Sequence, residues 1–195
     1  MPRPRKDAAR DTRALAVAAC HDLLHERGYL GFALKDVAER IHVRQASLYH
    51  HFPEGKEALV VEVALRTIER DAEGFREASA SHETVRERLT AIASYALTFS
   101  VGTGHMLQVN MRHLSAEHQQ TIYAAFHRSL YAPVQQVFQK GTQHGELRGM
   151  PPHQVDRAAW AFLDLVEQLG MNPEERHPEE LAVWIVNLML GGLAS

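Results

Sequence analysis

A short stretch of the chain carries polar side chains at adjacent positions, and all of them can form hydrogen bonds: Gln45, Ser47, Tyr49, His50 and His51. A glutamine amide can pair with adenine through two hydrogen bonds, and a serine hydroxyl can pair with several base edges. Leu48 and Phe52 are four residues apart, which is the spacing of one apolar helix face. The polar residues are therefore predicted on the other face of a short helix, where they suit contact with a nucleic acid.

A second short helix is predicted just upstream, at about 34–41, with an apolar side formed by Val37, Ala38 and Ile41. Val43 anchors the turn between the two helices. Two short helices with buried anchors and a polar outer face are typical of a helix-turn-helix, whose second helix enters the major groove of DNA.

The charge distribution agrees with this prediction. Residues 1–56 carry ten Lys and Arg against seven Asp and Glu, whereas the remainder carries eleven against seventeen. A basic N-terminal part on an acidic body suits a protein that presents one end to phosphates. The basic arm at residues 1–6 either follows the DNA backbone or minor groove, or is a solvated tail; the sequence leaves both open.

Composition and cysteine usage bound the class of protein. The chain has 195 residues, 45% of them hydrophobic and 23% charged, as expected of a soluble globular protein. The single cysteine, Cys20, excludes an intramolecular disulfide and is expected to be a buried thiol in a reducing compartment. With no secretory signal and no apolar run near 18 residues, we expect a cytoplasmic protein and no membrane partner.

The rest of the chain shows helical periodicity and no sustained alternation of the kind that predicts a strand. We therefore predict an all-α fold of about nine helices, with a three-helix head and a helical body. The predicted domains are a DNA-binding domain at 1–55 and an effector-binding and dimerisation domain at 56–195. Beyond the head, helices are predicted at about 55–76, 84–100, 105–113, 116–143 with a bend at Pro133, 153–169 and 178–191.

The last predicted helix is apolar nearly all the way round, so it is either central or shared with a partner. We expect helices 153–169 and 178–191 to pair with their copies in a two-fold, four-helix interface. The alternative is a monomer that buries its terminal helix. The residues expected at the dimer interface are Phe162, Val166, Trp184 and Leu188.

The segment SLYHHFPEGKEAL, residues 47–59, resembles the TetR/AcrR family of transcriptional regulators. The resemblance extends upstream through Gly28–Tyr29 and KDVAERI at 35–41, and covers roughly residues 10–65. It implies a DNA-binding head, a ligand-binding body and a homodimer on a palindromic double-stranded DNA operator. Most such proteins are repressors that a small effector releases, here expected to be apolar or amphipathic.

The resemblance also assigns DNA contacts by position. It places Gln45, Ala46 and Ser47 at the major groove, and assigns Lys56 and Lys35 to phosphates. The full set of expected DNA contacts is Lys35, Arg44, Gln45, Ala46, Ser47, Tyr49, His50, His51 and Lys56.

Three residues depart from the family pattern. Ala33 replaces a capping Thr or Ser, and His42 stands where Gly is common, at a turn that needs positive φ. Arg44 replaces a capping Ser and becomes a candidate contact to phosphate or guanine.

An effector cavity is predicted in the body, with aromatic and methionine walls and a few polar points. The same side chains could instead simply fill the core. They are Tyr95, Phe99, Met106, Met111, Tyr123, Phe126 and Phe162, with Arg112, His113 and His127 as polar points.

Two other classes of function find little support. The chain has thirteen histidines, but it contains no CxxC or HExxH, and Ser115 interrupts the candidate ligand pair His113 and Glu117. It also contains no Gly-rich phosphate loop and no GxSxG motif. We therefore expect no metal, no cofactor and no catalysis.

Overall fold

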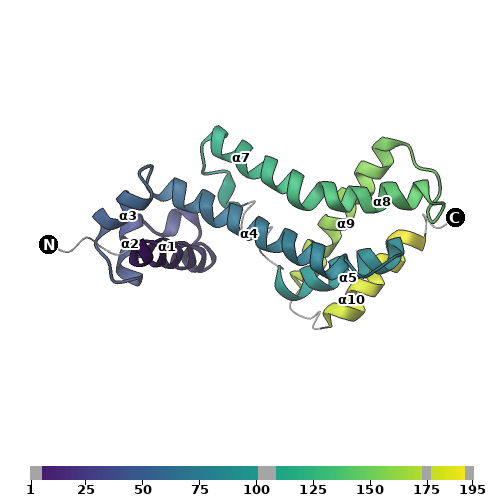
Figure 1. The fold of residues 1–195 in the computed structure, drawn as a ribbon, viewed down its shortest axis with the longest axis horizontal. Coiled ribbons are helices and arrows are strands. Elements are labelled where there is room, and N and C mark those ends of the chain that lie inside the picture. The colour runs from purple at the N-terminus through teal and green to yellow at the C-terminus, as the bar shows by residue number, and fades with distance from the viewer. Residues whose placement is uncertain (1–5, 101–108, 173–176, 192–195) are drawn as a thin grey trace. The chain divides into compact units, whose positions relative to one another are not determined.

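The computed structural model describes residues 6–100, 109–172 and 177–191. Over these ranges the chain forms nine α-helices, a short 3-10 helix and a π-helical turn, with no strand (Figure 1). The predicted all-α class is confirmed. The contacts divide the chain into unit 1, residues 1–67 with 106–122, and unit 2, residues 68–105 with 123–195.

Unit 1 contains the predicted three-helix head: α1 (Lys6–Arg27), α2 (Leu34–Arg40) and α3 (Gln45–His51), followed by the start of α4 (Lys56–Ser79). Helix α1 packs against both α2 and α3 (Figure 1). Leu23, Val37, Leu48 and Leu59 are fully buried between these helices. Cys20 lies in the same core, where burial raises the pKa of its thiol to about 12, as expected of an unreactive structural thiol.

The structure shows the local conformation at each of the three residues that depart from the family pattern. Ala33 cannot cap α2 with its side chain, but the Asp36 carboxylate accepts a hydrogen bond from the Ala33 amide at 2.6 Å. His42 adopts the positive φ that the turn requires, at 56°. Arg44 is the N-cap residue of α3 and makes no side-chain cap, so its guanidinium is not used in capping the helix.

A later segment of the chain also belongs to unit 1. The amide of Tyr29, in the 3-10 helix Tyr29–Gly31, donates to Asn110 Oδ1 at 2.6 Å, and the rings of Tyr29 and His113 stack at 5.6 Å. The predicted helix at 105–113 lies partly outside the described residues, and its described part is helical at 109–111. The next helix, α7, spans Ala116–Phe126.

Unit 2 is built from the remainder of α4 and from α5 (Val85–Phe99), α8 (Ala132–Gln143), α9 (Pro152–Gly170) and α10 (Pro178–Gly191). Helix α10 packs along α5, and α9 packs against α8 (Figure 1). The core includes Leu89, Phe138, Phe162 and Ile185, all fully buried. The Thr84 hydroxyl caps α5 by accepting from the Glu87 amide at 3.2 Å, as part of a capping box.

The distortion predicted near Pro133 is present as a π-helical turn at His127–Tyr131, between α7 and α8. Proline has no N–H to donate to the carbonyl four residues earlier, so regular α-helical bonding is interrupted at this point. The expected single helix at 116–143 is therefore α7, the π turn and α8 in succession.

Among the described residues, no helix is both long and apolar enough to span a membrane. The functional division at residues 55 and 56 stays a prediction.

Candidate nucleic-acid interface and ligand groove

The polar face of α3 is exposed, while its apolar face is buried. Leu48 is 0% exposed and Phe52 is 2% exposed, so both anchor the helix in the head. Ser47 and His51 are half-buried at the edge of the exposed face. The structure therefore brings the predicted contact residues of α3 to one accessible surface. The exposed ones are Arg44, Gln45, Ala46, Tyr49 and His50, and Lys35 is exposed on α2.

Arg13, which the sequence reasoning missed, fixes the C-terminal end of α3. Its guanidinium lies 4.8 Å from the centre of the Phe52 ring and donates to the His51 carbonyl at 3.1 Å. It also forms an ion pair with Glu62 of α4. Burial, followed by the charges of His50 and Arg13, lowers the pKa of His51, which favours its neutral form at neutral pH.

Lys56 points into the head rather than away from it. Its ammonium donates to the Phe32 carbonyl at 2.6 Å and to the Tyr29 carbonyl. It also lies 4.1 Å and 4.2 Å from the centres of the Tyr29 and Phe32 rings. Burial lowers the pKa of this lysine. The predicted phosphate contact of Lys56 stays a prediction, and these contacts give the residue a structural role that the sequence did not indicate.

A second cluster joins the first turn of α4 to the start of α7. Glu57 Oε1 accepts from the Ser115 amide at 2.5 Å and lies 2.8 Å from His118 Nδ1. The other imidazole nitrogen of His118 is 3.5 Å from Glu54. The hydrogen bonds from Ser115 and His118 lower the pKa of Glu57 to about 2. No local sequence signal identifies this cluster, because its members are about sixty residues apart.

The predicted effector residues are distributed over both units. Met111, Arg112 and His113 belong to unit 1, whereas the others that are described belong to unit 2. Met106 lies outside the described residues. Several of the unit 2 residues are in ring contacts: Tyr95 with Phe99 at 5.2 Å, Tyr123 with His127 at 6.2 Å, and Phe126 with Trp160 at 5.8 Å. Their role as a cavity wall stays a prediction.

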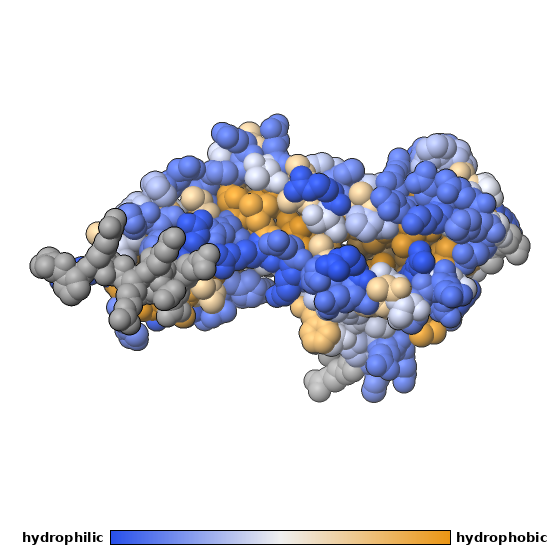
Figure 2. Space-filling model, in the orientation of Figure 1, coloured by the Kyte–Doolittle hydropathy of each residue, from blue (hydrophilic) through white to orange (hydrophobic). Residues whose placement is uncertain are grey.

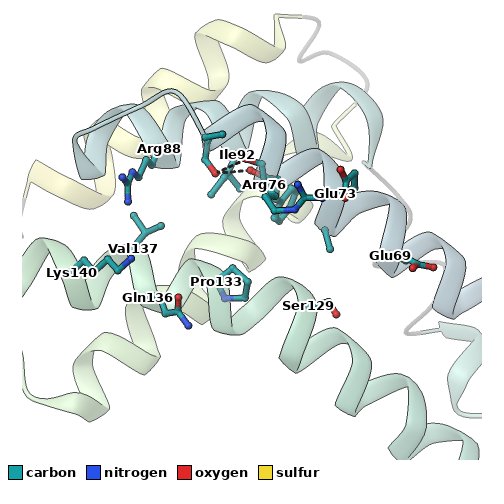
Figure 3. A pocket seen from close by; sticks show the side chains of 14 residues that line it. Glu69, Glu73, Arg76, Arg88, Ile92, Ser129, Pro133, Gln136, Val137 and Lys140 are labelled. Atoms are coloured by element: carbon teal, nitrogen blue, oxygen red, sulfur yellow. Dashed lines mark hydrogen bonds and ion pairs between the residues drawn. The ribbon is translucent and has the colours of Figure 1, made fainter.

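Unit 2 contains a groove of about 590 Å³ that none of those residues lines. Its walls come from α4, α5, the π turn and α8. Figure 3 shows its side chains, and Figure 2 shows apolar surface in unit 2 between hydrophilic rims. The apolar lining includes Phe75, Ile92, Pro133 and Val137, and the charged lining consists of Glu69, Glu73, Arg76, Arg88 and Lys140.

The residues expected at a dimer interface separate into two groups. Phe162 is 0% exposed and Val166 is 4% exposed, so both lie in the core of the single chain, and their expected place in an interface stays a prediction. A side chain without accessible surface cannot contact a partner unless the core repacks. Trp184 and Leu188 are 53% and 56% exposed on α10, beside Val183 at 47%. These three residues form an apolar α10 face on the protomer surface.

The described part of the chain holds no cluster of three or more His, Cys, Asp or Glu side chains arranged to bind a metal ion.

The geometry of the head and the helical second unit defines a helix-turn-helix protein with a groove in its body. Residues 16–63 match the family model described as bacterial regulatory proteins, tetR family. Among curated proteins, no sequence matches the chain.

Solved structures with this fold come from several bacteria. A regulatory protein of the tetR family from Rhodococcus RHA1 is 20% identical with a TM-score of 0.78, covering 94% of this chain and 97% of that one. FadR from Bacillus subtilis, solved with stearoyl-CoA, is 18% identical with a TM-score of 0.78, covering 92% and 98%. The ketosteroid regulator KstR2 of Mycobacterium tuberculosis is 19% identical with a TM-score of 0.70, covering 96% and 95%. The predicted resemblance is thus matched by the family model over residues 16–63, and the chain has the fold of tetR-family regulators.

Proposed function

We propose that this protein is a ligand-responsive, DNA-binding transcriptional regulator, and that it acts as a repressor. The observation that carries the proposal is the exposed polar face of α3, held on a buried apolar anchor within the segment that matches the tetR family model. Gln45 begins this helix, where recognition helices contact base edges. Tyr49 and Lys35 are exposed and suited to the phosphates on either side.

The proposed assembly is a homodimer on a palindromic operator. Two recognition helices on successive major grooves need half-sites about 34–36 Å apart, which a two-fold dimer provides. The exposed α10 face, Val183, Trp184 and Leu188, supports dimerisation because large apolar side chains rarely remain on a monomer surface as a group. Such a protein works in the cytoplasm by binding, not by catalysis.

The proposed signal is a small apolar or amphipathic effector in the groove of unit 2. The groove volume lies within the range of small-molecule sites, and its apolar lining with charged rims suits an amphipathic compound. The stearoyl-CoA bound to the FadR structure shows that this fold accommodates an amphipathic ligand, which supports the proposal for this chain. Helix α4 contributes Glu57 to unit 1 and Glu69, Phe75 and Arg76 to the groove. We therefore propose that α4 transmits the ligand-induced shift between conformations from the groove to the head.

Operator selection from random DNA, using the full-length protein, tests this function. We expect a palindromic site whose half-sites are separated by about one turn of DNA. Gln45→Ala is expected to alter the preferred base at one position of each half-site, whereas Lys35→Met is expected to weaken binding to all sequences alike.

The result that would overturn the proposal is the absence of any preferred site. If a site is selected and Gln45→Ala prefers the same bases as the unsubstituted protein, the recognition face is placed wrongly. An effector that binds tightly but leaves operator affinity unchanged would contradict the proposed coupling between ligand and DNA.

A further inference from the structure

The charged residues of the unit 2 groove are unevenly distributed along it. Arg88 from α5 and Lys140 from α8 lie at one end, and Glu69 of α4 lies at the other (Figure 3). Arg76 adds little to the net charge of the groove, because it forms an ion pair with Glu73, which lies on the same helix and also lines the groove. One end of the groove is therefore cationic and the other is acidic.

The two cations at the first end are available to a ligand. Arg88 is half-buried, and its Nε donates to the His82 carbonyl at 2.8 Å. This hydrogen bond fixes the guanidinium and leaves its two terminal nitrogens available to a ligand. Lys140 is exposed in the last turn of α8. Within the described ranges, no ion pair with a carboxylate involves Arg88 or Lys140, whereas Arg70 and Arg76 of the same unit each have one.

Between the two ends, part of the groove lining is apolar. Phe75, Ile92 and Val137 line it from three different helices. All three are largely buried, so their positions are fixed by the core, and the surface they present is preformed. An apolar chain can lie on this surface while its polar head remains at the cationic end.

We propose that the groove binds an amphiphile with an anionic head group, held between Arg88 and Lys140, with its apolar chain along Phe75, Ile92 and Val137. This inference rests on the proposed function, because it takes the groove to be the effector site. Glu69 repels an anion at the opposite end, so the ligand has one orientation. Two cations converging on one head group form charge-assisted hydrogen bonds, which are about twice as strong as neutral ones.

Calorimetry on the full-length protein without DNA tests the proposal, with four ligands that share a twelve-carbon chain. Dodecanoate and dodecyl phosphate carry anionic heads, dodecanol is neutral, and dodecyltrimethylammonium is cationic; all are used below their micelle concentrations. We expect both anions to bind at least about tenfold more tightly than dodecanol, and the cation to bind most weakly. Equal affinity for dodecanol and dodecanoate would overturn the proposal.

Variants locate the head group. The double substitution Arg88→Gln with Lys140→Gln is expected to weaken dodecanoate binding about tenfold and to leave dodecanol binding unchanged. Arg157→Gln, an exposed arginine of α9 outside the groove, is the matched control and is expected to bind like the unsubstituted protein. Thermal unfolding verifies that each variant is folded. Unchanged dodecanoate affinity in the double variant would show that the anion binds elsewhere.

Failure of this inference is separable from failure of the proposed function. Dodecanoate binding that leaves operator affinity unchanged would support the anionic site and contradict the coupling to DNA. An uncharged compound that binds this groove and releases the operator, together with no dodecanoate binding, would support the regulator and overturn the anionic site.

Discussion

Replacing Lys56 by methionine tests whether its ammonium stabilises the head. Methionine retains an apolar stem of similar length but removes the group that binds the Tyr29 and Phe32 carbonyls. It also removes the cation that lies 4.1 Å and 4.2 Å from the two ring centres. Both carbonyls are then left without this donor in a half-buried site.

The expected magnitude follows from these contacts. Hydrogen bonds that involve a charged group contribute about 1.5–3 kcal/mol, and a cation over an aromatic ring at a partly exposed site adds about 0.5–1 kcal/mol. Desolvation of the ammonium, which is also the main cause of its lowered pKa, offsets part of this gain. We expect Lys56→Met to lower the free energy of unfolding by about 2 kcal/mol, and the melting temperature by about 4–8 °C.

The measurement is chemical denaturation of Lys56→Met beside Lys35→Met, which removes an exposed lysine. Lys35→Met is expected to change stability by less than about 0.5 kcal/mol. It should reduce the slope of log affinity for DNA against log salt by about 0.9, the loss of one phosphate contact. A Lys56→Met variant as stable as the unsubstituted protein would refute the structural role. A reduced salt slope in a fully stable Lys56→Met protein would favour the phosphate contact predicted from the sequence.

Two further predictions concern the Glu57 cluster and the α10 face. Because the pKa of Glu57 is lowered from 4.5 to about 2, its contribution to stability is fully present above pH 4.5 and is lost as the pH falls toward 2. Glu57→Gln should cost about 1 kcal/mol at neutral pH and flatten that acid dependence in denaturation experiments, and an unchanged pH profile would exclude this carboxylate as its source. Trp184→Asp should convert the proposed dimer to a monomer at micromolar concentration by light scattering, whereas Gln139→Asp, on the exposed side of α8, should not. A Trp184→Asp protein that remains dimeric would place the interface on another surface.

Local sequence patterns predicted the helices well. The helix expected at 178–191 is α10, Pro178–Gly191, and that expected at 84–100 is α5, Val85–Phe99. Apolar spacing and capping residues are local signals, and helical hydrogen bonds join residues four apart, so these bounds need no tertiary information. The buried positions of Leu48 and Phe52 and the positive φ of His42 follow from equally local reasoning.

The direction of a side chain on its helix was harder to predict. Phe162 and Val166 lie on the apolar stripe of α9, but the sequence could not decide whether that stripe faces the protomer core or a partner. Both surfaces exclude water, so both favour the same residue types. Tertiary packing decided it, by placing this stripe in the core and leaving Trp184 and Leu188 on the surface.

The sequence by itself determined that this chain is helical, that α3 has one apolar and one polar face, and that the segment around it resembles the TetR/AcrR family. Only the tertiary structure turned the Lys56 ammonium toward the carbonyls of Tyr29 and Phe32, and brought Glu57 to Ser115 and His118. It alone set Arg88 and Lys140 at one end of a groove lined from several helices. The physical reason is that helix formation depends on neighbours within one or two turns, whereas these sites depend on how distant helices pack. Many sequences with the same apolar pattern can satisfy the same packing, so the pattern alone does not show which polar groups the packing brings together.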